Sequence, residues 1–277
     1  TRREETNVEI QWSLVLFTCL SGAGAWLLAC AGLDAFRGLT KKASVPAIVV
    51  AIVLIVAGGL ASATHLTHVD RIMAVLAHPA PGIFLEALLL GIDVIVAVVL
   101  LALVKREGSE AARKALGVAA VVMAVVFSYS CGSSYMMASQ LAWNTVTLPL
   151  GYLGTAAATG TALWYVLCAA LKEESPALAF AAQQTVAGGA AALVLSLAFG
   201  LVSGAALGAE ALTFWVGVVL CGGVVPAACG FVGMKKPESA LQLAVVAAAG
   251  ALIGSVAFRV LMWLASVALM SLFGATI

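Results

Sequence analysis

The chain has 277 residues, of which 63% are hydrophobic and only 10% charged, and its formal net charge is +1. A water-soluble domain carries about 25% charged residues, so most of this surface does not face water. The near-neutral charge gives no basis for a nucleic-acid partner. Repeated apolar runs of about 20 residues have the length that crosses a ~30 Å hydrocarbon layer, without the alternation typical of β-barrel strands. The sequence therefore predicts an all-α, polytopic membrane protein.

Eight membrane spans follow from these runs, at about residues 12–33, 45–64, 83–104, 115–138, 150–171, 178–207, 212–232 and 240–273. No link between them is long enough to form a soluble domain, and no strong repeat is visible, so we expect one integral-membrane domain over 1–277. The first run lacks a small-residue cleavage pattern and is interpreted as a retained span rather than a signal peptide. An even number of spans places both termini on one side of the membrane.

The distribution of lysine and arginine predicts the orientation, because basic residues gather in cytoplasmic links. The links after spans 1, 3, 5 and 7 hold Arg37, Lys41, Lys42, Lys105, Arg106, Arg113, Lys114, Lys172, Lys235 and Lys236. The opposite side holds only Arg2, Arg3 and Arg71. We therefore expect both termini to be extracytoplasmic, with Trp12, Trp143, Trp215 and Trp263 toward the outer interface, where indole rings are favoured.

Cysteine and histidine give no support for a metal centre. The six cysteines are scattered through the apolar runs without a C-x-x-C pair, so neither an iron–sulfur cluster nor zinc is predicted, and they are expected to pack as small apolar residues. The three histidines, His65, His68 and His78, all lie in one link. A transmembrane haem held by two histidines from different spans is therefore not expected. Their spacing is not specific for a metal, and no metal site is predicted.

Three ionisable residues lie inside spans, where each costs a few kcal/mol unless it is paired or faces a cavity. Glu86 and Asp93 are seven residues apart, on one helix face and roughly 10 Å apart along the axis. Arg259, in the last span, lies at a depth from which it could reach Asp93. For Asp93 and Arg259, an interhelical ion pair and a functional role both stay open.

The link from span 2 to span 3 gathers the proton-accepting groups. Residues 72–76 carry an apolar stripe typical of a short helix lying in the membrane interface, and Pro79 and Pro81 stop it before span 3. This hairpin is expected to bring His65 and Glu86 to one depth, in a pocket just below the outer surface. A histidine that titrates near neutral pH, beside a half-buried carboxylate, suits the acceptance of protons.

Five segments together resemble one family, the membrane anchor subunits of dimethyl sulfoxide reductase. They are EIQWSLVLFTCLSGAGAWLL, GGLASATHLTHVDRIMAVL, FLEALLLG, LGAEALTFW and AGALIGSVAFRVLMW. The likeness runs along nearly the whole chain. Its most specific part is the His-Leu after span 2, followed about twenty residues later by the Glu at the start of span 3. Span 8 departs from the family pattern, because Ala251 and Ser255 replace a Glu and an Arg, and Arg259 follows one turn farther out.

The resemblance implies a function in anaerobic respiration. Such an anchor, in the bacterial cytoplasmic membrane, binds menaquinol without haem or an iron–sulfur cluster of its own. It passes electrons to a four-cluster iron–sulfur subunit that serves a molybdopterin catalytic subunit. It hosts the quinol oxidation site but not the catalytic centre of the molybdoenzyme complex. By matching residues, His65 and Glu86 are the expected proton-accepting quinol ligands, and Asp93 and Arg259 are expected to line the inner wall of a site between spans 2, 3 and 8.

Two alternatives stay open at this point. One is a secondary transporter or proton-conducting membrane protein that uses Glu86, Asp93 and Arg259. Such proteins usually show internal repeats and helices broken near mid-membrane, and neither is clear in the sequence. The other is a passive anchor, in which the buried charges only hold helices together.

Overall fold

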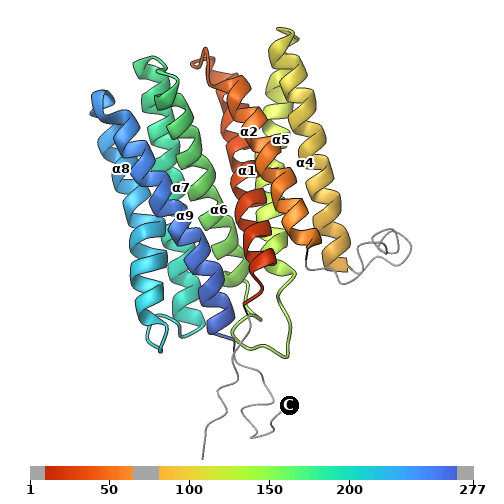
Figure 1. Cartoon of the computed structure of the whole chain (residues 1–277), viewed down its shortest axis with the longest axis vertical. Coiled ribbons are helices and arrows are strands. Elements are labelled where there is room, and N and C mark those ends of the chain that lie inside the picture. The colour runs from red at the N-terminus through yellow and green to blue at the C-terminus, as the bar shows by residue number, and fades with distance from the viewer. Residues whose placement is uncertain (1–9, 65–80, 267–277) are drawn as a thin grey trace, which may run out of the picture.

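The computed structural model describes residues 10–64 and 81–266, and these form an upright bundle of helices (Figure 1). In chain order the helices are α1 (Trp12–Arg37), α2 (Ser44–Ala63), α4 (Pro81–Lys105), α5 (Glu110–Ser133), α6 (Thr147–Ala170), α7 (Ser175–Val202), the π-helix η2 (Thr213–Val224), α8 (Val225–Gly233), the short η3 (Pro237–Ser239) and α9 (Ala240–Leu264). Since η2 continues into α8, eight segments of the described chain are long and apolar enough to cross a membrane. The prediction of an all-α protein with eight spans is confirmed.

Two spans end earlier than their apolar runs predicted. The fourth ends at Ser133 rather than near 138, where the Ser133 hydroxyl donates to the last-turn carbonyl of Ser130 at 3.0 Å. The sixth ends at Val202 rather than near 207, since Gly204 takes a left-handed φ of 78° that stops the helix. Within the described residues, helix α9 of the last span ends at Leu264, and residues 267–273 of the predicted span lie outside them.

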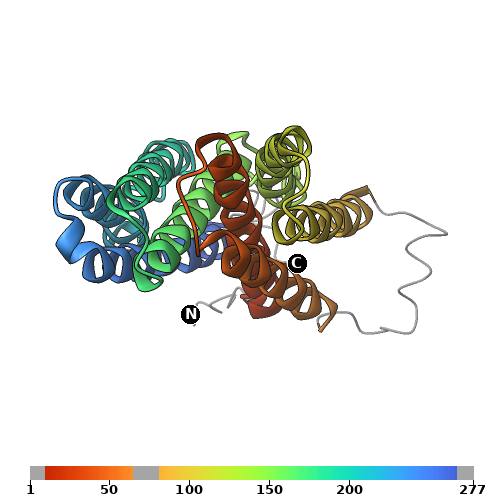
Figure 2. The ribbon, with the colours of Figure 1, turned by 90° about the horizontal axis from the view of Figure 1, so that it is seen from above.

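The helices form two four-helix halves with the same order of neighbours (Figure 2). In the first half, α1 packs on α2, α2 on α4, α4 on α5, and α5 on α1. In the second, α6, α7, η2 with α8, and α9 repeat this order, and the halves meet where α6 packs on α1 and α5. A matching W-x-x-x-C-A-x-L pattern occurs at 26–33 and at 164–171. The structure thus reveals an internal repeat of four helices. This repeat was not visible in the sequence, because it is preserved mainly in the order in which the helices pack.

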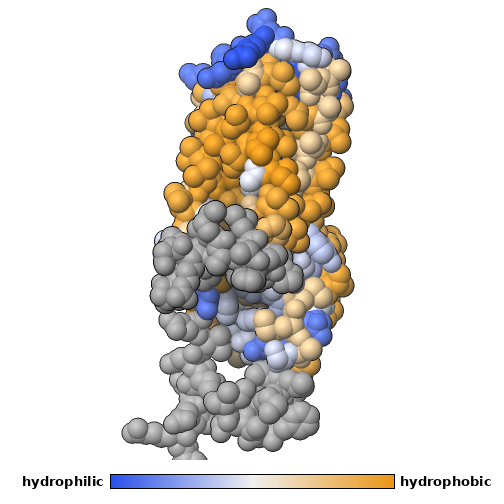
Figure 3. All heavy atoms as spheres, turned by 90° about the vertical axis from the view of Figure 1, so that its right-hand side faces the viewer, coloured by the Kyte–Doolittle hydropathy of each residue, from blue (hydrophilic) through white to orange (hydrophobic). Residues whose placement is uncertain are grey.

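An apolar belt covers the side of the bundle formed by α2 and α4 (Figure 3). Val53, Leu60, Ile95 and Val98 are all at least half exposed in this belt. Hydrophilic residues gather at the end of the molecule beyond the belt (Figure 3). Exposed aliphatic side chains between polar ends are what a lipid-facing surface requires.

Glycine permits the closest helix contact in the second half. A Cβ on Gly254 of α9 would lie 2.0 Å from the Cα of Gly222 in η2. No side chain fits there, so the two backbones touch directly. Helices in lipid gain little from apolar burial against one another and depend on such close packing.

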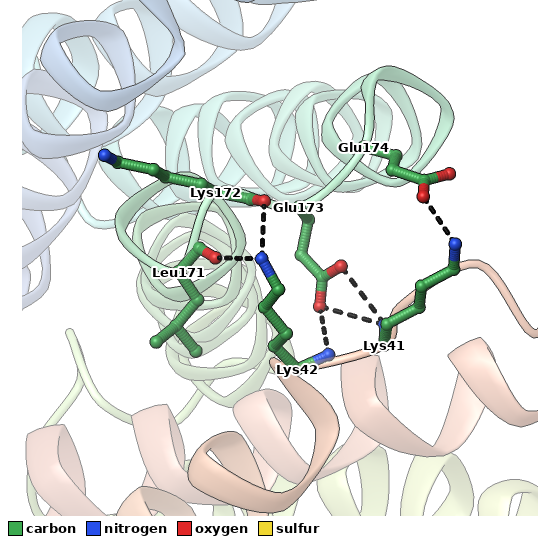
Figure 4. A network of polar contacts seen from close by, with 6 residues as sticks. All are labelled: Lys41, Lys42, Leu171, Lys172, Glu173 and Glu174. Carbon is green, nitrogen blue, oxygen red and sulfur yellow. Dashed lines mark hydrogen bonds and ion pairs between the residues drawn. The ribbon is translucent and has the colours of Figure 1, made fainter.

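One end of the bundle carries the links 38–43 and 171–174 and is called the basic end below. Glu173, in the link between α6 and α7, is only 6% exposed. Its carboxylate accepts from the backbone N–H groups of Lys41 and Lys42 at 2.6 to 3.1 Å (Figure 4). It also accepts from the backbone N–H of Ala43 at 2.7 Å, at the start of α2. The Lys42 ammonium in turn donates to the last carbonyls after α6, those of Leu171 and Lys172, at 3.4 Å (Figure 4). Each half therefore caps a helix end of the other.

Replacing Glu173 by glutamine is expected to lower the free energy of unfolding by about 2 kcal/mol at neutral pH, because hydrogen bonds to a charged acceptor are stronger than neutral ones. Burial by itself would raise the pKa of Glu173, but the three backbone donors outweigh it and lower the pKa below 4.5. The stabilisation is therefore fully present above pH 4.5. It is lost as the pH falls through the lower pKa that Glu173 has in the folded protein.

Unfolding followed in detergent between neutral and acidic pH tests this prediction. The difference between wild type and Glu173→Gln should be constant at neutral pH and vanish in acid. Glu174→Gln is the matched control. Glu174 forms an exposed pair with the ammonium of Lys41, so this variant should show no measurable change. Equal effects of the two variants would contradict the capping role.

Candidate functional site

The opposite end of the bundle, called the Glu86 end, holds the candidate site. Here α4 begins, α5 ends, α6 begins and α9 ends. Of the residues predicted for the site, Glu86, Asp93 and Arg259 are described. His65, together with His68 and His78, lies outside the described residues, as does the predicted interfacial helix at 72–76.

Glu86 sits in the second turn of α4 and is half-buried. The hydroxyl of Ser134, which follows the last residue of α5, donates to Glu86 Oε1 at 2.6 Å. The same hydroxyl lies 3.0 Å from the Cys131 carbonyl, so it holds the carboxylate against the end of α5. Glu86 therefore keeps one fixed partner and enough exposure to meet a ligand.

An aromatic cluster begins at the next residue, Tyr135. Its ring stacks on Tyr152 of α6 at 5.8 Å between centroids and meets the edges of Trp143 and Trp263 at 6.1 Å. The Trp143 indole N–H donates to the Met262 carbonyl at 2.8 Å. Burial, and after it the negative charge of Glu86, raise the pKa of the Tyr135 phenol well above its ordinary range. The cluster thus adjoins the carboxylate and is electrostatically coupled to it.

Arg259 of α9 is 1% exposed and lies behind this cluster. Its Nε donates to Thr18 Oγ1 at 2.7 Å and its Nη2 to the Thr18 carbonyl at 3.1 Å. Its Nη1 donates to Ser255 Oγ at 2.8 Å, to the Ser255 carbonyl at 2.9 Å and to Thr155 Oγ1 at 3.3 Å. The guanidinium also lies over the Tyr152 ring, 4.6 Å from its centroid. All of these partners are neutral, so no carboxylate of the described residues compensates the cation directly.

The ring of Tyr152 lies between Tyr135 and the Arg259 guanidinium, because it contacts both. Arg259 therefore lies at one end of this aromatic stack, and Glu86 is held by Ser134, the residue before Tyr135 at the other end. A carboxylate, a cation and aromatic surfaces are the groups that accept a proton, stabilise developing negative charge and bind a flat ring.

Asp93 does not belong to this stack. It is 1% exposed in α4, and neither carboxyl oxygen has a hydrogen-bond partner among the residues that the structure describes. The interhelical ion pair with Arg259, left open by the sequence, is not formed, because the guanidinium is occupied by hydroxyl and carbonyl oxygens. Asp93 is thus a buried polar group without local compensation.

Replacing Asp93 by valine is expected to raise the free energy of unfolding by about 1–2 kcal/mol, because it removes an unpartnered buried polar group. Asp93→Asn, which keeps the size and polarity, should leave stability nearly unchanged. Thermal unfolding of both variants in the same detergent measures the difference. A loss of stability in Asp93→Val larger than in Asp93→Asn would mean that the carboxyl has a stabilising partner.

The packing also changes the expected position of the site. A pocket between spans 2, 3 and 8 is not supported, because α4 packs on α2 and α5, whereas α9 packs mainly on α6, η2 and α8. The site instead involves the 134–146 link, whose Ser134, Tyr135 and Trp143 the sequence analysis did not assign to it. The signal available in the sequence was an uncharged link rich in hydroxyl and aromatic residues directly after a span.

These features define a class, a polytopic helical membrane protein with a carboxylate, an aromatic cluster and a buried arginine at one end of its bundle. The chain belongs to the DMSO reductase anchor subunit (DmsC) family, whose model matches residues 7–209. Membership implies association with a molybdoenzyme complex and confirms the predicted resemblance. The match covers α1 to α7 and ends before η2, so α9 and its Arg259 lie beyond it. No curated protein gives a significant match to the chain.

Proposed function

We propose that this anchor subunit oxidises menaquinol in the bacterial cytoplasmic membrane and passes the electrons to a four-cluster iron–sulfur subunit, which supplies a molybdopterin catalytic subunit. The observation that carries the proposal is the Glu86 carboxylate, held by Ser134 beside an aromatic cluster at the end where the His65 link enters α4. The family match supports the same assignment.

In the proposed reaction a quinol gives up two protons and two electrons and becomes a quinone. His65 and Glu86 accept the protons, one from each hydroxyl. The aromatic cluster around Tyr135 provides a flat apolar surface for the ring, and Arg259 supplies positive potential from behind Tyr152. The electrons leave one at a time for the cluster of the iron–sulfur subunit that docks at the Glu86 end.

The proposed orientation places the basic end in the cytoplasm and the Glu86 end outside, with both termini extracytoplasmic. The ten basic residues in the links of one end support this orientation. The protons would then be released on the outer side.

The test is His65→Ala in the assembled complex. We expect quinol-dependent turnover to fall by at least about a hundredfold, because a general base contributes 10²–10⁴-fold. Co-purification of the partner subunits, and turnover with an artificial reductant that feeds those subunits directly, should stay unchanged. His68→Ala and His78→Ala are the matched controls and should retain quinol turnover. Unchanged quinol turnover in His65→Ala would refute the assignment.

A further inference from the structure

A polar cavity of about 420 Å³ lies at the basic end, far from the candidate quinol site. It is enclosed by the last turn of α1, the start of α2, the end of α4 and the start of α5. Its apolar wall includes Leu100 and Val104, and its polar wall includes Asp34, Arg37 and Arg113. Because all four helices end or begin here, the cavity lies at the level of the lipid headgroups rather than in the hydrocarbon layer.

Most charged groups around the cavity already have partners. The Lys41 ammonium pairs with Glu174, and the Lys42 ammonium donates to two backbone carbonyls of the 171–174 link. Glu110 pairs with Lys114 on the outer face of α5. The contacts of Lys41 and Lys42 join the two links, and the Glu110–Lys114 pair lies within α5.

Three other charged residues line the cavity, one carboxylate and two guanidinium groups. Asp34 is 4% exposed, and its Oδ2 accepts from Thr40 and Ser44, but its Oδ1 is buried without a partner. The Nε of Arg113 is likewise buried without a partner among the described residues. Arg37 also lines the cavity, and its guanidinium lies over the Phe180 ring at 5.1 Å. The cavity thus offers guanidinium donors and one carboxylate acceptor.

We propose that this cavity binds the phosphoethanolamine headgroup of a phospholipid. A phosphate matches the donor geometry of a guanidinium, with Arg113 and Arg37 as its ligands. A primary ammonium carries three donors and matches the free Oδ1 of Asp34. A glycerol headgroup has no cation for this carboxylate, and a choline headgroup has no N–H to donate. The presence of both charges therefore selects phosphatidylethanolamine over the other two.

The experiment measures which phospholipid the full-length protein retains. The purified complex is exchanged into mixed micelles with equal amounts of phosphatidylethanolamine, phosphatidylglycerol and phosphatidylcholine, and bound lipid is identified by native mass spectrometry. We expect phosphatidylethanolamine to be enriched by about tenfold or more, since a hydrogen bond to a charged group contributes about 1.5–3 kcal/mol. Asp34→Asn should abolish this preference, and Arg113→Gln should weaken retention of all three lipids.

Arg106→Gln is the matched control, because Arg106 is exposed in the same region and does not line the cavity. If Asp34→Asn disturbs the link between α1 and α2, Val45→Phe fills the cavity from α2 and should abolish retention without altering a charge. Equal retention of the three lipids by wild type, or an unchanged preference in both Asp34→Asn and Val45→Phe, overturns the proposal. The proposal is also overturned if soluble phosphoethanolamine or inorganic phosphate protects the protein against thermal unfolding as well as phosphatidylethanolamine vesicles do. A free phosphate compound would then be the ligand.

Discussion

Replacing Glu86 by glutamine is expected to reduce quinol-dependent electron transfer by at least about a hundredfold while the protein folds and assembles normally. Glutamine keeps the size of the side chain and can still accept the Ser134 hydroxyl proton, so the local packing is preserved. It cannot take up a proton from a quinol hydroxyl, and loss of a positioned proton acceptor typically costs 10²–10⁴-fold. The loss should appear in turnover and persist at saturating quinol.

Two serines at the end of α5 provide matched controls for Glu86→Gln. Ser134→Ala removes the hydrogen bond of 2.6 Å to the carboxylate and should lower quinol turnover only about fivefold, since one such bond contributes about 1 kcal/mol. Ser133→Ala removes a hydroxyl that donates to the Ser130 carbonyl of its own helix and should have no effect on turnover. If Glu86→Gln retains full quinol turnover, the carboxylate is not the proton acceptor.

Replacing Arg259 by alanine is expected to have the largest effect on stability, about 3 kcal/mol in the free energy of unfolding. The substitution empties a fully buried volume and removes five hydrogen bonds and the contact with Tyr152. The hydroxyls of Thr18 and Thr155 are not left unpaired, because they also donate to the Leu14 and Gly151 carbonyls at 3.0 and 2.9 Å. The loss therefore comes mainly from the cavity and the charged hydrogen bonds. Thermal unfolding in detergent measures it.

Methionine at position 259 separates structural from functional roles of the cation. The methionine of Arg259→Met fills most of the volume of the arginine side chain. Because burying a charge without a counterion is costly, the free energy of unfolding of this variant should differ from that of wild type by no more than about 1 kcal/mol. Quinol turnover should nevertheless fall about tenfold, because positive potential behind Tyr152 would no longer stabilise charge on the quinol oxygen. Arg259→Met with wild-type turnover would show that the arginine only holds helices together.

The number and approximate limits of the spans could be predicted because length and apolarity alone determine them. The end of the bundle at which the lysines and arginines gather could also be predicted from the sequence. The partners of the buried charges could not be predicted in this way. The sequence left open an ion pair between Arg259 and Asp93, but the hydrogen bonds of Arg259 go to Thr18, Thr155 and Ser255, whose hydroxyls are common in spans and carry no charge signal. Helix adjacency decides such contacts, and span order alone does not reveal adjacency.

Within the candidate site, Glu86 was predictable because a carboxylate in an apolar run is rare and costly. Tyr135 and Trp143 were not, since aromatic residues in a link between spans are ordinary membrane-interface residues. Only the packing of α6 and α9 against that link brings these two rings into one cluster with Tyr152 and Trp263. The prediction for His65 stays a prediction, because its link lies outside the described residues.

The carboxylate of Glu173 has a consequence for the order of biogenesis. The three N–H groups at the start of α2 receive their acceptor from a residue about 130 positions later in the chain. The second helix thus enters the membrane with an uncapped amino end and gains its cap only after the fifth helix has been translated and inserted. A nascent chain arrested before residue 173 should accordingly expose the 38–43 link to proteolysis, and a longer nascent chain should protect it.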